Sequence, residues 1–462
     1  MSKRQNATAA PGLLEDYSQA FDDLFSKVSQ RAGFRQYLTG LLLGSERNKT
    51  LTGLVNSEPV VGAQEARVQS LQWYLSESTW DAVAVNERRL ELLLKSAALR
   101  PSENGALVID ETGDRKDGHK TAHVGRQYLA NLGKIDNGVV SVSSLWADEQ
   151  VYYPLDVEPY TPAAWFEGGK ANPGFRTKLK IAGELVQQAK QRGILFRAVV
   201  ADNFYGEDRT FRRSLDQAGI GYVLALKPSF TWWHYVGDIG SPQEAALVAA
   251  WTGPSQPGDW VGVERSFRDG HREQWWALEV VAGPFGPERS LRCEVVTTDP
   301  LTLPVLTTWN LITNLPAPGS QQAADSPLAA ADLVELVRLY GLRTWVEQSY
   351  KQVKHTLGWA DYQVRSDRAI RRHWTLVCCA FTFCWWQTTL IPHSEESSPV
   401  HIPALPEPPE SQKKRRARAA TQLGLAASAA PGQSLARTLY PAQALVASLL
   451  ATPSSSTLTA PS

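Results

Sequence analysis

Two short apolar segments that each run into an aspartate constrain the fold of this chain most. Residues 106–113 (ALVIDETG) and 197–206 (RAVVADNFYG) both have the pattern of a buried strand followed by an acid. The segment between them, 175–193, carries apolar residues at helical spacing and closes with Gly193. Strands and helices in this succession predict an α/β fold, in which a mixed sheet is flanked by helices.

The apolar periodicity changes along the chain and divides it. Helical spacing dominates before residue 100, and alternating, Trp-rich segments such as QWWALEVVAG follow residue 228. The end of the chain is rich in Pro, Ser and Ala, which predicts a disordered tail. The expected divisions are 1–99, an N-terminal helical domain; 100–228, the first part of the α/β core; 229–318, a β-rich insertion; 319–392, the second, helical part of the core; and 393–462, the tail.

Composition sets only loose limits on function. The chain has 47 basic and 47 acidic residues, a net charge of +0, which is a mild argument against a nucleic-acid partner because phosphates favour basic surfaces. A basic active-site face can still coexist with an acidic remainder. Four cysteines are too few for a disulfide framework, and the first residues lack the apolar core of a secretory signal, so we expect a cytoplasmic location.

Basic residues of the N-terminal region allow two interpretations. Arg31, Arg35, Arg47 and Lys49 lie within one stretch of the helical segment. They can form a basic face that contacts DNA, or they can belong to an ordinary solvated helix bundle. The sequence favours neither.

Asp110 and Asp202 are the first candidates for chemistry. Either one alone is equally well explained as a cap of a turn or helix. Strands of one sheet can, however, deliver both carboxylates to one edge, where hard divalent cations bind oxygen ligands. Two such ions about 3.5–4 Å apart can activate a nucleophile and stabilise the leaving oxygen of a phosphoryl displacement.

A third acid, Glu347, lies in residues 331–358, which predict one or two helices. At roughly 100° per residue, Arg343, Glu347 and Lys354 lie at about −60°, −20° and −40° from Tyr340, so all four share a face if the helix is continuous. Arginine and lysine hold phosphate oxygens, and tyrosine can donate to them. The alternative is an amphipathic helix with i,i+4 ion pairs such as Arg343–Glu347.

This spacing resembles the Y-R-E-K signature of insertion-sequence transposases in the DDE group. The segments VIDETG and VVADNFYG likewise resemble the first- and second-aspartate blocks of DDE endonuclease domains. The resemblance covers roughly residues 100–390. It implies an RNase H-like fold with a β-rich insertion between the second aspartate and the glutamate, preceded by a helical DNA-binding domain at 1–99.

The resemblance also implies roles for seven residues. The catalytic and metal-binding residues would be Asp110, Asp202 and Glu347. The phosphates of the element's end would be contacted by Tyr340, Arg343 and Lys354. Trp309 would stack near a flipped base, although a core tryptophan on a strand is an equal alternative.

Cofactors, partners and reaction follow from the same resemblance. Two ions of Mg²⁺ or Mn²⁺ per active site would activate water to nick the transposon ends, and the freed 3′-OH would attack a phosphodiester, in many members through a hairpin. The partners would be double-stranded DNA, as terminal inverted repeats and as target, and a second copy in a DNA-bound homodimer, with no membrane, in a bacterial nucleoid. Two other functions stay open: a transposase-derived DNA-binding regulator that does not cut, and a structure-specific nuclease on the same fold.

Other polar groups are expected to be structural. His119 and His123 have the spacing of a zinc pair on a helix, but their segment predicts a loop and no third ligand is near. Cys378, Cys379 and Cys384 are expected in the core. Asp114 and its neighbours predict a solvated loop after the first acid block, although they could line a DNA groove. The basic run 413–418 in the tail could touch DNA non-specifically.

Overall fold

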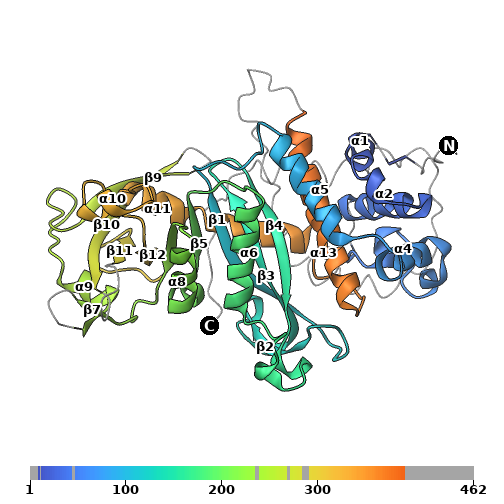
Figure 1. The fold of residues 1–462 in the computed structure, drawn as a ribbon, viewed down its shortest axis with the longest axis horizontal. Helices are drawn as coiled ribbons and strands as arrows, with labels where there is room; N and C mark the ends of the chain where they lie inside the picture. Colours follow the sequence, from blue (N-terminus) through green and yellow to red (C-terminus); the bar gives the residue numbers. More distant parts are fainter. Residues whose placement is uncertain are drawn as a thin grey trace, which may run out of the picture.

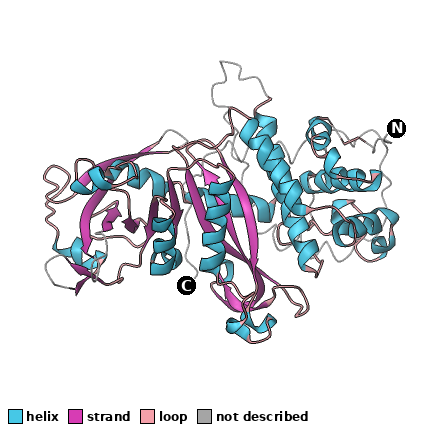
Figure 2. Ribbon diagram, viewed as in Figure 1, coloured by secondary structure: helices cyan, strands magenta, loops and turns pink. Residues whose placement is uncertain are grey.

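The computed structural model describes residues 9–10, 12–43, 47–234, 239–267, 271–283 and 291–390. The predicted tail at 393–462, with its basic run, lies outside these residues. A twelve-stranded sheet in the order β2-β3-β1-β5-β6-β12-β11-β10-β7-β8 forms the centre of the molecule, with β4 added on β3 and β9 on β10. Figure 2 shows the strands of this sheet covered by helices.

The middle of the sheet has the RNase H-like arrangement that the resemblance implies. β1 pairs antiparallel with β3 and parallel with β5, β3 pairs antiparallel with β4, and β5 pairs parallel with β6. The strands of this part are β1 (Ala106–Arg115), β2 (Gly125–Leu129), β3 (Lys134–Ala147), β4 (Tyr152–Tyr160), β5 (Ala198–Ala201) and β6 (Tyr222–Ala225). The predicted α/β fold class with a mixed sheet is therefore confirmed.

Helices α6 (Lys178–Gln191), α7 (Asn203–Gly206) and α8 (Arg209–Gln217) connect the parallel strands. α6 begins where the Thr177 hydroxyl accepts a hydrogen bond from Lys180 N at 3.1 Å. It ends before Gly193, whose φ of 71° is a conformation that glycine adopts without strain. Figure 1 shows α6 lying along the strands β3 and β4.

The β-rich segment extends the central sheet. Strand β12 pairs antiparallel with β6, with Leu311 opposite Ala225, so the edge of the parallel part is covered. The elements of this part are β7 (Trp232–His234), β8 (Ile239–Gly240), α9 (Pro242–Val248), β9 (Val261–Ser266), β10 (Arg272–Gly283), β11 (Leu291–Thr297) and β12 (Thr308–Thr313). The sequence predicted the strands here but not their continuity with the core.

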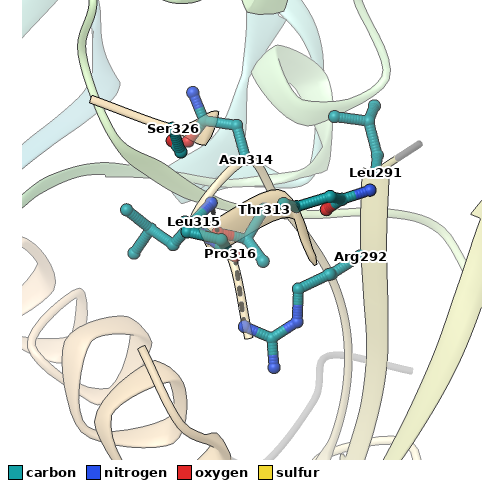
Figure 3. Close-up of a pocket in the computed structure, with 8 residues that line it drawn as sticks. Leu291, Arg292, Thr313, Asn314, Leu315, Pro316 and Ser326 are labelled. Carbon is teal, nitrogen blue, oxygen red and sulfur yellow. Dashed lines mark hydrogen bonds between the residues drawn. The ribbon is translucent and has the colours of Figure 1, made fainter. Parts of the chain in front are cut away.

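Residues 315–330 pack against the extended sheet. They contain α10 (Gln321–Asp325) and border a cavity of ≈ 10 Å³ beside β11 and β12 (Figure 3). Arg292 Nη1 donates to Leu315 O at 3.1 Å and to Ala331 O at 2.8 Å. These bonds fix the start of the next helix against β11.

The N-terminal helices pack on the last helix of the core. They are α1 (Leu13–Gln19), α2 (Val28–Leu42), α3 (Leu51–Leu54), α4 (Ala66–Ser76) and α5 (Ala82–Lys95), and the C-terminal helices are α11 (Leu333–Gly341), α12 (Thr344–His355) and α13 (Asp367–Thr388). Figure 1 shows α13 running beside α5. The Tyr37 hydroxyl lies 2.8 Å from His373 Nδ1, and Tyr17 donates to Cys379 O at 3.1 Å. Helices α1, α2, α4 and α5 therefore share one hydrophobic core with α13.

The idea of a basic N-terminal face fails for three of its four residues. Arg31 and Arg35 are 4% exposed and Lys49 is 7% exposed. Arg35 forms forked ion pairs with Glu15 and Asp22, and Lys49 donates to backbone carbonyls of α2 and its end. Burial of these cations is compensated by internal acceptors, so they are not available to DNA.

Helix α13 carries the apolar segment of the chain. Cys378, Cys379 and Cys384 are free and buried in it, as predicted. Among the described helices, none combines the length and the apolar character needed to cross a bilayer.

Candidate active site

Asp110 and Asp202 lie next to each other because of the register of two parallel strands. Ile109 of β1 is the partner of Ala201 of β5, and each aspartate is the next residue along its chain. Adjacent parallel strands are about 4.8 Å apart. The two carboxylates therefore leave the sheet at one edge, as the sequence predicted.

Asp110 is 7% exposed, and its Oδ1 accepts a hydrogen bond from Glu111 N at 2.7 Å. The pKa of this carboxyl is raised to about 7, mainly by burial. The charge of Arg343 lowers this pKa, and the charge of Asp202 raises it. A buried acid beside a second acid needs a cation nearby to stay ionised.

Asp202 has a structural role as well as its place at the edge. It is the N-cap of α7, where its Oδ1 accepts a hydrogen bond from Phe204 N at 3.0 Å. This cap orients the side chain at the end of β5. The capping interpretation and the catalytic interpretation are therefore compatible.

Arg343 joins the first acid to the third. Its Nη2 lies 3.2 Å from Asp110 Oδ2, and its Nη1 lies 3.3 Å from Glu347 Oε1. Glu347 lies in the first turn of α12 and its side chain is 48% exposed. The i,i+4 ion pair that the sequence offered as an alternative is thus present, but the same guanidinium also reaches β1.

The four residues of the Y-R-E-K pattern do not lie on one continuous helix. α11 ends at Gly341, a poor helix former, and α12 begins at Thr344. A tight turn joins the two helices, in which Arg343 N donates to Tyr340 O at 3.0 Å. The pKa of Tyr340 is raised to about 12, mainly by burial; the charges of Asp202, Asp110 and Glu347 also raise it, and Arg343 lowers it.

Trp309 packs against Tyr340. Their ring centroids are 5.0 Å apart in an edge arrangement, and the Trp275 and Trp309 ring centroids are 4.6 Å apart. Trp309 thus lies on strand β12 beside the candidate site, and it also contributes to a cluster of rings. Both interpretations of this tryptophan have structural support.

Lys354 is held by an acid of β1. Its Nζ lies 2.7 Å from Asp114 Oδ1 and donates to Gly113 O at 3.0 Å, and the two side chains are 15% and 3% exposed. The expectation that Asp114 belongs to a solvated loop is wrong, because β1 continues to Arg115 and turns this carboxylate inward. The pair ties the helix of Glu347 to the strand of Asp110.

A further polar network, which the sequence interpretation missed, adjoins the two aspartates. Glu111 Oε1 lies 2.6 Å from Lys178 Nζ, and the buried Tyr205 hydroxyl donates to Glu111 Oε2 at 3.1 Å. Tyr205 follows Asp202 by three residues. The signal was visible in VIDETG, where a second acid directly follows Asp110. This network links the segments that carry the two aspartates.

The donor chemistry of the site fits a divalent cation. The three acids supply oxygen ligands, which Mg²⁺ and Mn²⁺ prefer. The guanidinium of Arg343 lies between two of them, and its buried Nε has no partner in the described part of the chain. As arranged, no group of three acid, histidine or cysteine side chains among the described residues forms a ready-made metal site. A metal ion would therefore compete with Arg343.

His123, one of the two histidines of residues 119–123, has hydrogen-bond partners on two other segments. His123 Nδ1 lies 2.7 Å from the Thr161 hydroxyl, and its Nε2 lies 2.7 Å from Asp367 Oδ1. These bonds attach the loop after β1 to the start of α13.

An RNase H-like sheet with two aspartates at one edge, and a helical glutamate that shares an arginine with one of them, is typical of a class of nucleic-acid-cutting enzymes. Family models agree: one described as DDE superfamily endonuclease matches residues 20–273, and one described as transposase DDE domain matches residues 170–383. The chain belongs to the DDE family of insertion-sequence transposases. It is 33% identical over 365 residues, 78% of this chain and 84% of the relative, to a probable transposase for insertion sequence element IS701 from Microchaete diplosiphon.

Proposed function

We propose that this transposase cuts the ends of its insertion sequence and joins the freed 3′-OH to target DNA. The reaction would combine phosphodiester hydrolysis and transesterification at one site with two divalent ions. The observation that carries this proposal is the contact of Arg343 with both Asp110 and Glu347, beside an aspartate pair aligned by strand register.

Asp110, Asp202 and Glu347 are the proposed ligands of Mg²⁺ or Mn²⁺. When bound, such ions lower the pKa of water and stabilise the leaving oxygen of an in-line displacement. In this reaction the protein would hold together the carboxylates of three residues that are far apart in the sequence. The cap of α7 fixes Asp202, and the strand β1 fixes Asp110.

Tyr340, Arg343 and Trp309 are proposed to bind the DNA end. Arg343 can exchange the carboxylates for phosphate oxygens when metal neutralises the acids, because a guanidinium binds either one through two N–H groups. The buried Tyr340 hydroxyl can donate to a phosphate. Trp309 offers an aromatic surface on which a base can stack.

Lys354 is proposed to act mainly by positioning α12, the helix that carries Glu347. Its buried pair with Asp114 favours a role in fixing α12 against β1, since a phosphate contact requires this pair to open. A contribution to DNA binding then depends on a rearrangement of the β1 end.

The proposed partners are double-stranded DNA, as the terminal inverted repeats and as the target, and a second copy of the chain. Two ends must be joined in one event, so we propose a homodimer on DNA, acting at the bacterial nucleoid. The domain division remains a prediction, including the DNA-binding role of residues 1–99. Arg31, Arg35 and Lys49 do not support that role, because they are buried.

Cleavage of the DNA that flanks the coding region tests the proposal. Wild-type protein should nick a duplex from this region in Mg²⁺ but not in EDTA. Asp110→Asn should lose cleavage by at least about 100-fold while it retains DNA binding, a size typical for loss of a catalytic group. Asp117→Asn is the matched control, because Asp117 lies in the loop after the same strand and its side chain is 89% exposed. Equal cleavage by wild type and Asp110→Asn would remove Asp110 from the site.

A further inference from the structure

Arg265 of β9 is held by aromatic rings. Its Cζ lies 4.5 Å from the Trp275 ring centroid, 4.6 Å from that of Trp309 and 4.7 Å from that of Phe267. Cation–π contacts of this kind orient a guanidinium and leave its N–H edge free to donate. The three rings come from β10, β12 and the end of β9, so the sheet itself fixes the arrangement.

Within the described residues Arg265 forms no ion pair, although the charge of Glu273 acts on it. Among the described residues, no carboxylate lies within ion-pair distance of Arg265, and no oxygen accepts a hydrogen bond from it. Glu273 is its partner across the strands, but that carboxylate accepts a hydrogen bond from Trp275 Nε1 at 2.9 Å and lies 3.5 Å from His271 Nε2. Burial lowers the pKa of Arg265 to about 10, so the guanidinium is still charged at neutral pH.

Arg265 borders the candidate active site. A Cβ added to Gly341 would lie 3.0 Å from Arg265 Nη2, so the guanidinium passes directly over the turn between α11 and α12. Arg343 lies in that turn. On the other side, Trp309 contacts both Arg265 and Tyr340. One continuous group of side chains therefore leads from the acids into the β-rich part of the sheet.

We propose that Arg265 binds a backbone phosphate of the DNA strand on the side of the active site that faces β9 and β12. A guanidinium that aromatic rings hold in place, with no ion pair among the described residues, is suited to two phosphate oxygens. The rings beside it add apolar surface against which a sugar or base can pack. This inference rests on the proposed function, because it requires DNA to bind across Asp110, Asp202 and Glu347.

The small residue at position 341 belongs to the same arrangement. A Cβ at Gly341 would lie 3.0 Å from Arg265 Nη2, so the guanidinium would have to shift by a few tenths of an ångström. Gly341→Ala should therefore weaken the Arg265 contact without removing any charge. It provides a second variant that keeps the charge of Arg265, and it also changes the turn that carries Arg343.

The salt dependence of DNA binding tests the proposal. Full-length protein in EDTA is titrated with a labelled duplex from the DNA that flanks the coding region, at several salt concentrations. Loss of one phosphate contact makes the plot of log K against log salt shallower by about 1. We expect this change for Arg265→Gln, and a slope close to that of the wild type for Arg265→Lys, which retains the charge.

Arg272→Gln is the matched control. Arg272 lies on the neighbouring strand β10, its side chain is 67% exposed, and it pairs with Glu264 at 2.9 Å. Its loss should leave the slope unchanged. Equal slopes for Arg265→Gln and Arg272→Gln, with both variants folded by thermal melting, overturn the proposal for Arg265.

Cleavage in Mg²⁺ is measured on the same duplex, to separate this proposal from the function on which it rests. Absence of cleavage by wild type and Arg272→Gln alike counts against the proposed function. Normal wild-type cleavage with an unchanged slope in Arg265→Gln counts against the Arg265 contact alone.

Discussion

Arg343 Nη2 lies 3.2 Å from Asp110 Oδ2, which joins residues 233 positions apart in the chain. The same guanidinium contacts Glu347, so it lies where a metal ion would bind these two acids. A metal ion bound there would compete with the guanidinium for the same oxygens. A change at Arg343 should therefore affect metal binding and cleavage in opposite directions.

Arg343→Gln should bind Mn²⁺ more tightly than wild type in the absence of DNA, by about tenfold, which corresponds to ~1.4 kcal/mol. Its DNA cleavage should be slower, because a proposed phosphate ligand is lost. Titration of Mn²⁺ followed by electron paramagnetic resonance measures the first effect. Weaker Mn²⁺ binding by the variant would contradict the competition.

Lys354→Met should destabilise the fold by about 3 kcal/mol, because it leaves Asp114 buried without its cation. The double variant Lys354→Met/Asp114→Leu should recover part of this loss. Urea unfolding measures both. Lys351→Met is the control on the exposed side of the same helix, with an expected change below about 0.5 kcal/mol. A Lys354 variant as stable as the control would mean that the pair does not hold α12 to β1.

Glu294 makes stability depend on pH. Burial raises its pKa from 4.5 to about 8, and neither of its oxygens has a hydrogen-bond partner in the described part of the chain. Arg292 Nε is 3.7 Å away, but its guanidinium is hydrogen-bonded to Glu279, so burial outweighs the attraction. The folded state retains a proton that the unfolded state has lost.

The free energy of unfolding should therefore fall as pH rises from about 4.5 to about 8, on the order of 4 kcal/mol from this residue alone. Glu294→Gln carries no titrating group, so its unfolding energy should lack this contribution and exceed that of wild type at pH 8. Urea unfolding at a series of pH values measures the slope. Identical slopes for the two proteins would show that Glu294 is already ionised in the fold.

Arg35→Gln separates a structural cation from a DNA-binding one. Arg35 bonds Glu15 through two nitrogens at 2.8 Å each, and Asp22 at 2.6 and 3.0 Å. The variant should lose about 3 kcal/mol of stability, because two acids are left without their partner. The salt dependence of DNA binding by the folded variant should equal that of wild type. A shallower dependence would restore Arg35 to a DNA-contacting face.

The sequence was informative where local pattern decides geometry. Apolar runs that end in Asp110 and Asp202 identify strands, and parallel neighbours bring their ends to one edge, so the proximity of the two aspartates could be predicted. The spacing of the Y-R-E-K pattern brought Arg343 and Glu347 together as an i,i+4 pair. It could not show the break at Gly341, because the turn keeps helical backbone angles while it tightens.

Long-range partners of charged residues could not be predicted. Arg35 is buried because Glu15 and Asp22, on other elements, face it, and no periodicity reveals that choice. Lys354 and Asp114 meet only because α12 crosses the end of β1. The contact of Arg265 with three aromatic rings likewise depends on how β9, β10, β11 and β12 pair.

The central claim is that Asp110, Asp202 and Glu347 share bound divalent ions. Fe²⁺ bound in place of Mg²⁺ cuts the polypeptide next to its own ligands when ascorbate and peroxide are added. We predict cuts in the segments around residues 110, 202 and 347, which excess Mg²⁺ suppresses and Asp110→Asn abolishes. Cuts that omit one of these segments, or that Mg²⁺ does not affect, would contradict the claim.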